Sequence, residues 1–272
     1  MHGLLGLRVL ASGSGGNCAA LVVREGAGAR VILIDAGLSP RRTRTLLGVC
    51  GLGGLPIAAI LLTHLDHDHW QETWARARPE GCETIVHGAH RGRAAREGAF
   101  FGRARIIERE AEVCGLRVRA MLAAHDEEGV AAYRIESPCG ASLGWATDLG
   151  RVTEDLAAHL AGVDVLGIES NYCPRMQAES DRPAFLKRRI MGGAGHLSNA
   201  ESAAAAGRIG ATRARVLLHL SRQCNTPDLA LAAHAGGETP VVVASQDAPT
   251  GWISLSREAA MSAGGPTLAP HA

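Results

Sequence analysis

The sequence has few aromatic residues, almost no net charge and no long apolar run. Aromatic residues occupy 3% of the 272 positions, so we expect a core built from Val, Ile, Leu and Ala. The formal net charge of +1 gives the whole protein no strong field toward nucleic acid or membrane, so a polyanionic substrate would need a local basic surface. No stretch of about 20 apolar residues could span a bilayer, and Arg8 interrupts the apolar N-terminal run, which disfavours a signal peptide.

The cysteines are not arranged for disulfides or for a structural zinc site. Seven are scattered along the chain, and no Cys-x-x-Cys pair occurs. An odd number at wide spacing fits neither a disulfide framework nor a zinc knuckle. We therefore expect reduced thiols in a reducing compartment, and a cytoplasmic protein.

The segment Thr-His-Leu-Asp-His-Asp-His-Trp at residues 63–70 carries the strongest chemical signal. Its three histidines and two aspartates directly follow the apolar residues 57–62, which predict a buried strand. Sheets of α/β proteins place their sites where such strands end. Imidazole suits zinc, iron or manganese, and carboxylates suit the harder of these ions. The segment therefore predicts a metal site.

Three further residues have the same placement. His125, Asp148 and His219 each follow a predicted strand. One such histidine alone is more often structural, but together with the residues at 64–69 they supply about seven ligands. That number is enough for two metal ions with open positions for water and substrate.

Predicted strands and helices alternate along the chain in a pattern that favours two sheets packed face to face with helices outside. The predicted strands are residues 7–10, 19–23, 30–35, 57–62, 84–86, 116–119, 130–135, 141–146, 163–168, 215–220 and 240–244. The predicted helices are residues 41–50, 71–78, 90–98, 153–160, 184–190, 199–208 and 227–234. We expect an α/β protein with a four-layer αβ/βα sandwich, one domain over residues 1–260 and a flexible tail over 261–272.

Several motifs, in order along the chain, resemble one family. They are Ser-Gly-Ser-Gly-Gly-Asn at 12–17, Asp-Ala-Gly-Leu-Ser at 35–39, Thr-His at 63–64, Thr-Asp-Leu-Gly at 147–150, Glu-Ser-Asn-Tyr at 169–172, Gly-His-Leu-Ser-Asn at 195–199 and His-Leu-Ser at 219–221. The chain resembles metallo-β-lactamase-fold hydrolases, and more narrowly the YycJ/WalJ group, whose characterised members resemble DNA exonucleases.

The resemblance implies a set of metal ligands, with Asp148 bridging two ions. The set is His64, Asp68, His69, His125, Asp148 and His219. In the family pattern His-x-His-x-Asp-His, the second histidine is replaced here by Asp66. Either Asp66 binds the first metal or His67 does after a backbone shift. We favour Asp66, because adjacent residues of an extended segment point in opposite directions.

A third carboxylate would change the metal preference. It lowers the net charge of the centre and favours harder ions. We expect two divalent metal ions, with zinc first and manganese or iron as competitors. Close metal ions would activate water for in-line attack, and Asp68 could orient that nucleophile.

His196 resembles the histidine that ribonuclease Z-like relatives use near the leaving group, and Glu169 could orient it. The alternative is a capping loop with an idle histidine. Possible substrate contacts are Ser198, Asn199 and the basic run Lys187, Arg188 and Arg189, which could grip phosphates or simply face solvent.

Three classes of function remain open at this point. The first is a phosphodiesterase acting on nucleic acid, as a DNA exonuclease. The second is a small-molecule hydrolase, either a cyclic phosphodiesterase or a thioesterase. The third is a noncatalytic metal-binding protein, if Asp66 disables the site. Because the other ligand positions are filled, the sequence favours an enzyme, and the motif around His196 favours the first class.

Overall fold

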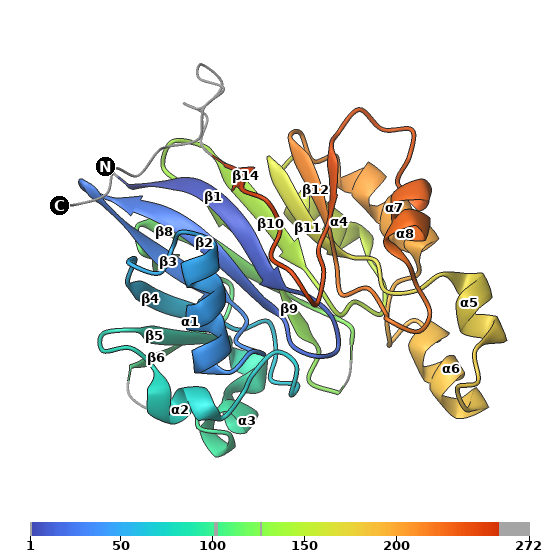
Figure 1. Ribbon diagram of the computed structural model, residues 1–272, viewed down its shortest axis with the longest axis horizontal. Coiled ribbons are helices and arrows are strands. Elements are labelled where there is room, and N and C mark those ends of the chain that lie inside the picture. Colours follow the sequence, from blue (N-terminus) through green and yellow to red (C-terminus); the bar gives the residue numbers. More distant parts are fainter. Residues whose placement is uncertain (1, 101–102, 126, 256–272) are drawn as a thin grey trace.

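Two seven-stranded sheets pack face to face and carry helices on their outer sides in the computed structural model (Figure 1). The structure describes residues 2–100, 103–125 and 127–255. The predicted four-layer α/β sandwich is confirmed. The predicted tail at 261–272 lies outside the described residues.

The first sheet begins as an antiparallel meander and continues with parallel strands. Its order is β14-β1-β2-β3-β4-β5-β6. The pairs β1–β2 and β2–β3 are antiparallel, whereas β3, β4, β5 and β6 run parallel. The strands are β1 (His2–Ala11), β2 (Cys18–Glu25), β3 (Gly28–Ile34), β4 (Ile57–Leu61), β5 (Glu83–His87), β6 (Ala104–Ile107) and β14 (Ile253–Ser254).

The second sheet has the same division into an antiparallel and a parallel half. Its order is β13-β12-β11-β10-β9-β8-β7, and β10, β11, β12 and β13 run parallel. The strands are β7 (Glu110–Val113), β8 (Leu116–Ala123), β9 (Val130–Glu136), β10 (Ser142–Ala146), β11 (Val165–Glu169), β12 (Ala214–Leu218) and β13 (Val241–Val243). In each sheet the parallel strands bring their carboxyl ends to one edge.

The helices form the outer layers, apart from one pair that projects from the sandwich. They are α1 (Pro40–Val49), α2 (Thr73–Ala77), α3 (Arg91–Arg96), α4 (Glu154–Leu160), α5 (Pro174–Glu179), α6 (Ala184–Met191), α7 (Asn199–Ile209) and α8 (Pro227–Ala233), with a 3-10 turn at Gly88–His90. Helices α1, α2 and α3 cover the first sheet, and α4, α7 and α8 cover the second (Figure 1). Helices α5 and α6 extend away from both sheets (Figure 1).

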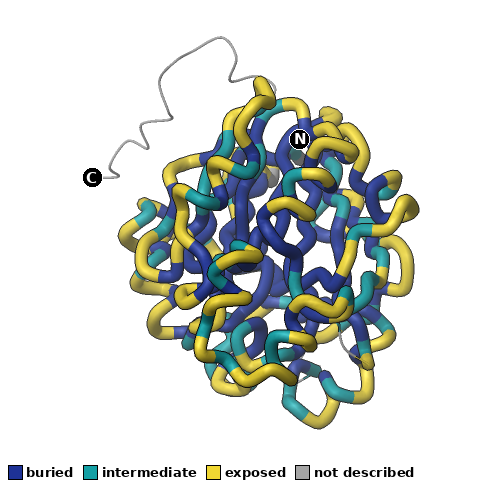
Figure 2. Tube along the Cα trace, turned by 90° about the vertical axis from the view of Figure 1, so that its right-hand side faces the viewer, coloured by how far each residue is buried: buried dark blue, intermediate teal, exposed yellow. Residues whose placement is uncertain are grey.

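Three layers of apolar contacts hold the sandwich together. The largest lies between the sheets, where side chains such as Leu21, Ile32, Tyr133 and Val216 are fully buried. The other two lie between each sheet and its helices. Buried backbone therefore forms the centre of the molecule, with exposed segments around it (Figure 2). Since both sheets share one core, this packing supports our proposal that they form one domain.

All eleven predicted strands and seven predicted helices are present, with ends shifted by a few residues. The sequence reading missed β6, β7, β14 and α5, which are 4, 4, 2 and 6 residues long. Such short segments give too few positions for a periodic pattern. Among the described helices, none has the length and apolar character needed to cross a membrane.

Candidate metal centre

The loop after β4 is held by the backbone of two neighbouring segments. Asn17 N donates to Asp68 O at 2.7 Å, and Ala36 N donates to His69 O at 2.8 Å. A Cβ atom at Gly37 would lie 1.7 Å from Asp68 O, so only glycine permits this close approach. These contacts fix the direction in which the side chains at 64–69 leave the loop.

The predicted metal ligands lie in two adjoining groups, and within each group the candidate ligand atoms are all within 4.8 Å of one another. One group consists of His64, Asp66 and His125, and the other of Asp68, His69 and His219. Asp148 lies between the groups. Its Oδ2 is 3.6 Å from His64 Nε2 and 2.5 Å from His69 Nε2, and its Oδ1 contacts His219 Nδ1. The arrangement could hold two cations with Asp148 shared between them.

Asp66, and not His67, faces the first group. Asp66 Oδ2 lies 3.9 Å from both His64 Nε2 and His125 Nε2, whereas His67 is exposed. Asp66 Oδ1 also accepts a hydrogen bond from Arg93 Nη1 at 2.8 Å. This guanidinium offsets the additional carboxylate charge at the edge of the centre.

The buried polar atoms of the centre fit bound cations. His64 Nε2, both carboxylate oxygens of Asp148 and both ring nitrogens of His219 have no well-directed hydrogen bond to another described residue. Their close contacts are with other histidines and carboxylates of the centre. Leaving such atoms without partners costs free energy, and metal coordination would supply the missing interaction.

Partners on the side of each histidine ring away from the centre determine which ring nitrogen faces it. His69 Nδ1 lies 2.8 Å from Asp35 Oδ2, and His64 Nδ1 lies 3.0 Å from Thr63 Oγ1, which itself donates to Asp35. His125 Nδ1 lies 3.1 Å from Gly195 O. Each contact leaves Nε2 directed at the candidate metal position, as second-sphere partners of metal-binding histidines do. The sequence analysis assigned no role to Asp35, although this residue begins the family motif at 35–39.

Imidazoles and carboxylates of the centre shift each other's protonation. Burial lowers the pKa of His69, but Asp148 and Asp35 outweigh it and raise that pKa well above its usual value. Burial lowers the pKa of His219 as well, but Asp148 outweighs it and raises that pKa well above its usual value. For Asp148, burial raises the pKa, but His219 and His69 hold it well below its usual range. Cation binding would therefore displace protons from His69 and His219.

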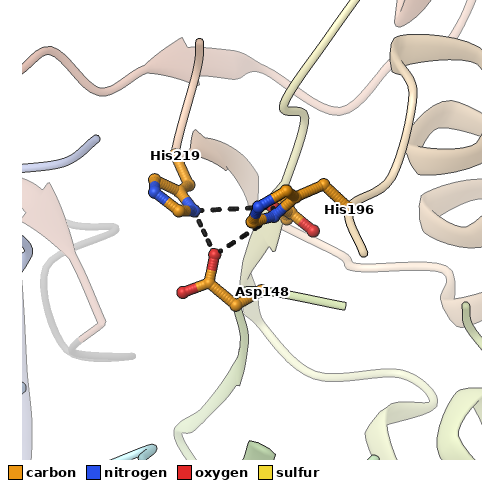
Figure 3. A group of neighbouring side chains, drawn as sticks. Asp148, His196 and His219 are labelled. Carbon is orange, nitrogen blue, oxygen red and sulfur yellow. Dashed lines mark hydrogen bonds and ion pairs between the residues drawn. The ribbon is translucent and has the colours of Figure 1, made fainter. Parts of the chain in front are cut away.

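His196 faces the same centre from the loop before α7 and is held by Glu169. Its Nδ1 lies 2.6 Å from Glu169 Oε1 and 3.4 Å from Asp148 Oδ1. Figure 3 shows His196 and His219 directed toward Asp148 from different elements. Burial lowers the pKa of His196, but Glu169 and Asp148 raise it to about 9. The expected pairing of Glu169 with His196 is present.

Three residues of the centre have strained backbone. Asp35, Asp148 and His219 have φ angles of 61°, 52° and 54°, in the left-handed region that non-glycine residues rarely adopt. Asp35 and His219 directly follow β3 and β12, and Asp148 lies two residues after β10. Concentrated strain of this kind is typical of functional sites.

Ser198 and Asn199 are turned inward. Ser198 caps α7 and bonds Glu201, and Asn199 is bonded to Ser170 and Asn225 in a buried polar network. Both are 4% exposed. Their polar atoms are engaged inside the protein, which favours support of the His196 loop over the substrate contact we expected.

The basic run lies on α6, outside the metal groups. Lys187 Nζ donates to Ala178 O at 2.7 Å, while Arg188 and Arg189 are exposed. The run therefore faces solvent, and its guanidinium groups are accessible to a ligand.

The comparisons with known proteins agree with this architecture. A family model described as a β-lactamase superfamily domain matches residues 30–220. The chain therefore belongs to this superfamily, in its metallo-β-lactamase-fold branch. It is a metallo-β-lactamase-fold hydrolase whose histidine and aspartate groups fit divalent metal ions.

Curated relatives cover most of the chain. Exodeoxyribonuclease WalJ of Streptococcus pneumoniae serotype 2 is 27% identical over 231 residues, which are 82% of this chain and 84% of that protein. Exodeoxyribonuclease YycJ of Bacillus anthracis is 28% identical over 230 residues, with the same coverage of 82% and 84%.

Solved structures share the fold at lower identity. Zn²⁺-bound PqqB of Methylobacterium extorquens has a TM-score of 0.66 at 21% identity, covering 92% of this chain and 99% of that one. The metallo-β-lactamase-fold protein YhfI of Bacillus subtilis has a TM-score of 0.65 at 15% identity, covering 90% of this chain and 98% of that one.

Proposed function

We propose that the protein is a dinuclear metal-dependent phosphodiesterase that degrades DNA as an exonuclease. The observation that carries the proposal is the pair of adjoining ligand groups with Asp148 between them. The names of the two exodeoxyribonuclease relatives support DNA as the substrate.

We assign His64, Asp66, His125 and Asp148 to the first metal, and Asp68, His69, His219 and Asp148 to the second. The two groups of neighbouring ligand atoms and the exposed position of His67 support this division. Zinc is our first assignment, with manganese or iron in competition because Asp66 adds a hard ligand.

The bound cations would supply an activated water and neutralise charge on the phosphodiester. Asp68 would orient the attacking water, and the position of its Oδ2 at the second ligand group, 3.3 Å from His219 Nε2, supports this role. His196 would remain protonated through Glu169 and donate a proton, or a hydrogen bond, to the departing oxygen.

Reconstitution with zinc, manganese or iron, followed by incubation with end-labelled DNA, end-labelled RNA and bis-p-nitrophenyl phosphate, tests the proposal. We expect DNA to be shortened from an end. Hydrolysis of the small diester alone would contradict the nuclease assignment and favour a small-molecule hydrolase. An Asp68→Ala variant with full activity would contradict the dinuclear mechanism.

A further inference from the structure

We propose that the outer face of α6, formed by Phe185, Arg188 and Arg189, binds a single-stranded segment of the nucleic acid and leads it to the metal centre. Phe185 would stack on an unpaired base, and the two arginines would bind phosphates. This inference rests on the proposed function and deepens it, because it names the form of the substrate.

The inner face of α6 already has its packing partners. Leu186 and Ile190 pack with Tyr172, Met176 and Cys224 in a small apolar cluster. Phe185 points away from this cluster and is 67% exposed. Among the exposed large apolar side chains of the described residues, only Val49 is more exposed, at 73%. Phe185 therefore offers its ring to a ligand and adds little to the core.

The charge of this region differs from that of the whole protein. Residues 174–191 contain five arginine or lysine residues and two acidic ones, so their net charge is +3 against +1 for the full chain. Arg182 bonds Gln177, Ser221 and Gln223, and Lys187 donates to a backbone oxygen. By contrast, we find no hydrogen bond or ion pair from the side chains of Arg188 and Arg189 to any residue in the described part of the chain.

The three residues share one side of the helix. Arg188 and Arg189 follow Phe185 by three and four positions, and such residues are neighbours on a helix surface. An aromatic ring beside cationic groups is the combination that single-strand-binding proteins use, with stacking for bases and positive charge for the backbone. A base inside a duplex has both faces covered, so this surface favours an unpaired strand.

The C-terminal end of α6 adjoins the loop that carries His196. Arg188 and Arg189 lie in the last turn of α6. The following loop reaches His196, whose N–H donates to Ile190 O at 3.0 Å, while Gly195 O lies 3.1 Å from His125 Nδ1. A strand held at this end of α6 would therefore lie beside the loop that carries His196.

Binding of a fluorescent, phosphorothioate-linked 12-nucleotide single strand to the metal-loaded protein tests the surface by fluorescence anisotropy. Phe185→Ala should raise Kd about tenfold, given the usual strength of base–aromatic stacking. Phe185→Leu should bind as weakly as Phe185→Ala, while Phe185→Trp should bind like the unmodified protein. Arg188→Ala/Arg189→Ala should reduce the slope of log K against log salt by about 1.4, because each phosphate contact on a single strand contributes about 0.7.

The matched charge control is Arg24→Ala/Arg76→Ala, which removes two exposed arginines from β2 and α2. This control should bind the strand, and hydrolyse bis-p-nitrophenyl phosphate, like the unmodified protein. Three results would overturn the proposal: no binding of the strand, unchanged binding by Phe185→Leu, or an equal loss in the control. A change of sedimentation mass in Phe185→Ala would also overturn it, by showing that the face joins two copies of the chain.

The two proposals can fail separately. If the protein binds the strand through α6 but cleaves no nucleic acid, the proposed function is wrong and the surface remains. If it degrades DNA and the α6 variants keep the KM and Kd of the unmodified protein, the surface is wrong and the function remains.

Discussion

The Asp35 carboxylate lies 2.8 Å from His69 Nδ1 and so holds His69 Nε2 toward Asp148. Asp35 also accepts hydrogen bonds from the backbone N–H and the hydroxyl of Thr63. One buried carboxylate therefore orients His69 of the second ligand group. Through Thr63 it also orients His64 of the first ligand group.

We expect Asp35→Asn to lower metal affinity by about 10- to 100-fold, the usual effect of losing a carboxylate behind a histidine ligand. Asparagine tolerates the φ of 61° at this position, so the fold should persist. Metal titration of the apoprotein measures the effect. Asp155→Asn, an exposed carboxylate of α4, is the control and should bind metal normally. Equal affinity in both variants would contradict the orienting role of Asp35.

Asp66→His should shift the metal preference toward zinc. The change exchanges a hard carboxylate for an imidazole and adds one unit of positive charge. We expect the ratio of manganese-supported to zinc-supported activity to fall about tenfold, which corresponds to about 1.4 kcal/mol of differential binding.

The control for this prediction is His67→Ala, which removes an exposed histidine from the same loop and should leave the ratio unchanged. Arg93 pairs with Asp66 and would lose that partner in Asp66→His. The double variant Asp66→His/Arg93→Ala removes the unpaired guanidinium, which would otherwise repel the metal ion. If His67→Ala alone alters the metal ratio, His67 and not Asp66 completes the first site.

Glu169→Gln should move the basic limb of the pH profile to lower pH. Glu169 and Asp148 raise the pKa of His196 to about 9 against the effect of burial. A protonated His196 acts below its pKa, so activity is lost as pH rises through that value. Removing the negative charge of Glu169 lowers this pKa, and we expect a shift of roughly one to two pH units.

The profile of kcat against pH, measured on an end-labelled DNA strand whose departing alkoxide needs a proton, tests this assignment. His196→Gln should abolish the limb while retaining reduced activity from the metal centre. A limb that stays in place in Glu169→Gln would show that another group, and not His196, provides the proton.

The fold was predictable because most of its strands are short, largely apolar segments, several of which end in polar residues. Residues 57–62 predicted both the buried strand β4 and the position of the loop that follows it. His125, Asp148 and His219 were recognisable by the same placement, and the structure brings them together with the loop.

Contacts between distant segments were beyond the reach of local patterns. Asp35 meets His69 across 34 positions, and no local pattern predicted that pair. Likewise, Ser198 and Asn199 are polar residues beside His196, which suggested contact with substrate. Only the tertiary structure shows that their side chains are turned inward. The exposure of Phe185 depends on how α6 packs, which no spacing rule determines.

Gly37 and Gly207 should respond in opposite ways to substitution by alanine, because one is enclosed and the other is open. A Cβ at Gly37 would meet Asp68 O at 1.7 Å, a backbone atom of the metal loop that cannot move without displacing His69. Gly37→Ala should therefore lower both stability and metal affinity, with a loss of stability of roughly 1–3 kcal/mol for overpacking.

Gly207 lies within α7, and apart from the adjacent backbone of the helix no atom of the protein lies within 4 Å of a Cβ built there. Gly207→Ala should raise stability by about 0.5–1 kcal/mol, since it restricts the unfolded chain and fits the helix. Urea unfolding measures the stability of both variants. Metal titration distinguishes them further, because Gly207→Ala should bind metal like the unmodified protein. If Gly37→Ala retained normal stability and metal affinity, the close contact between residues 37 and 68 could not be what positions the loop.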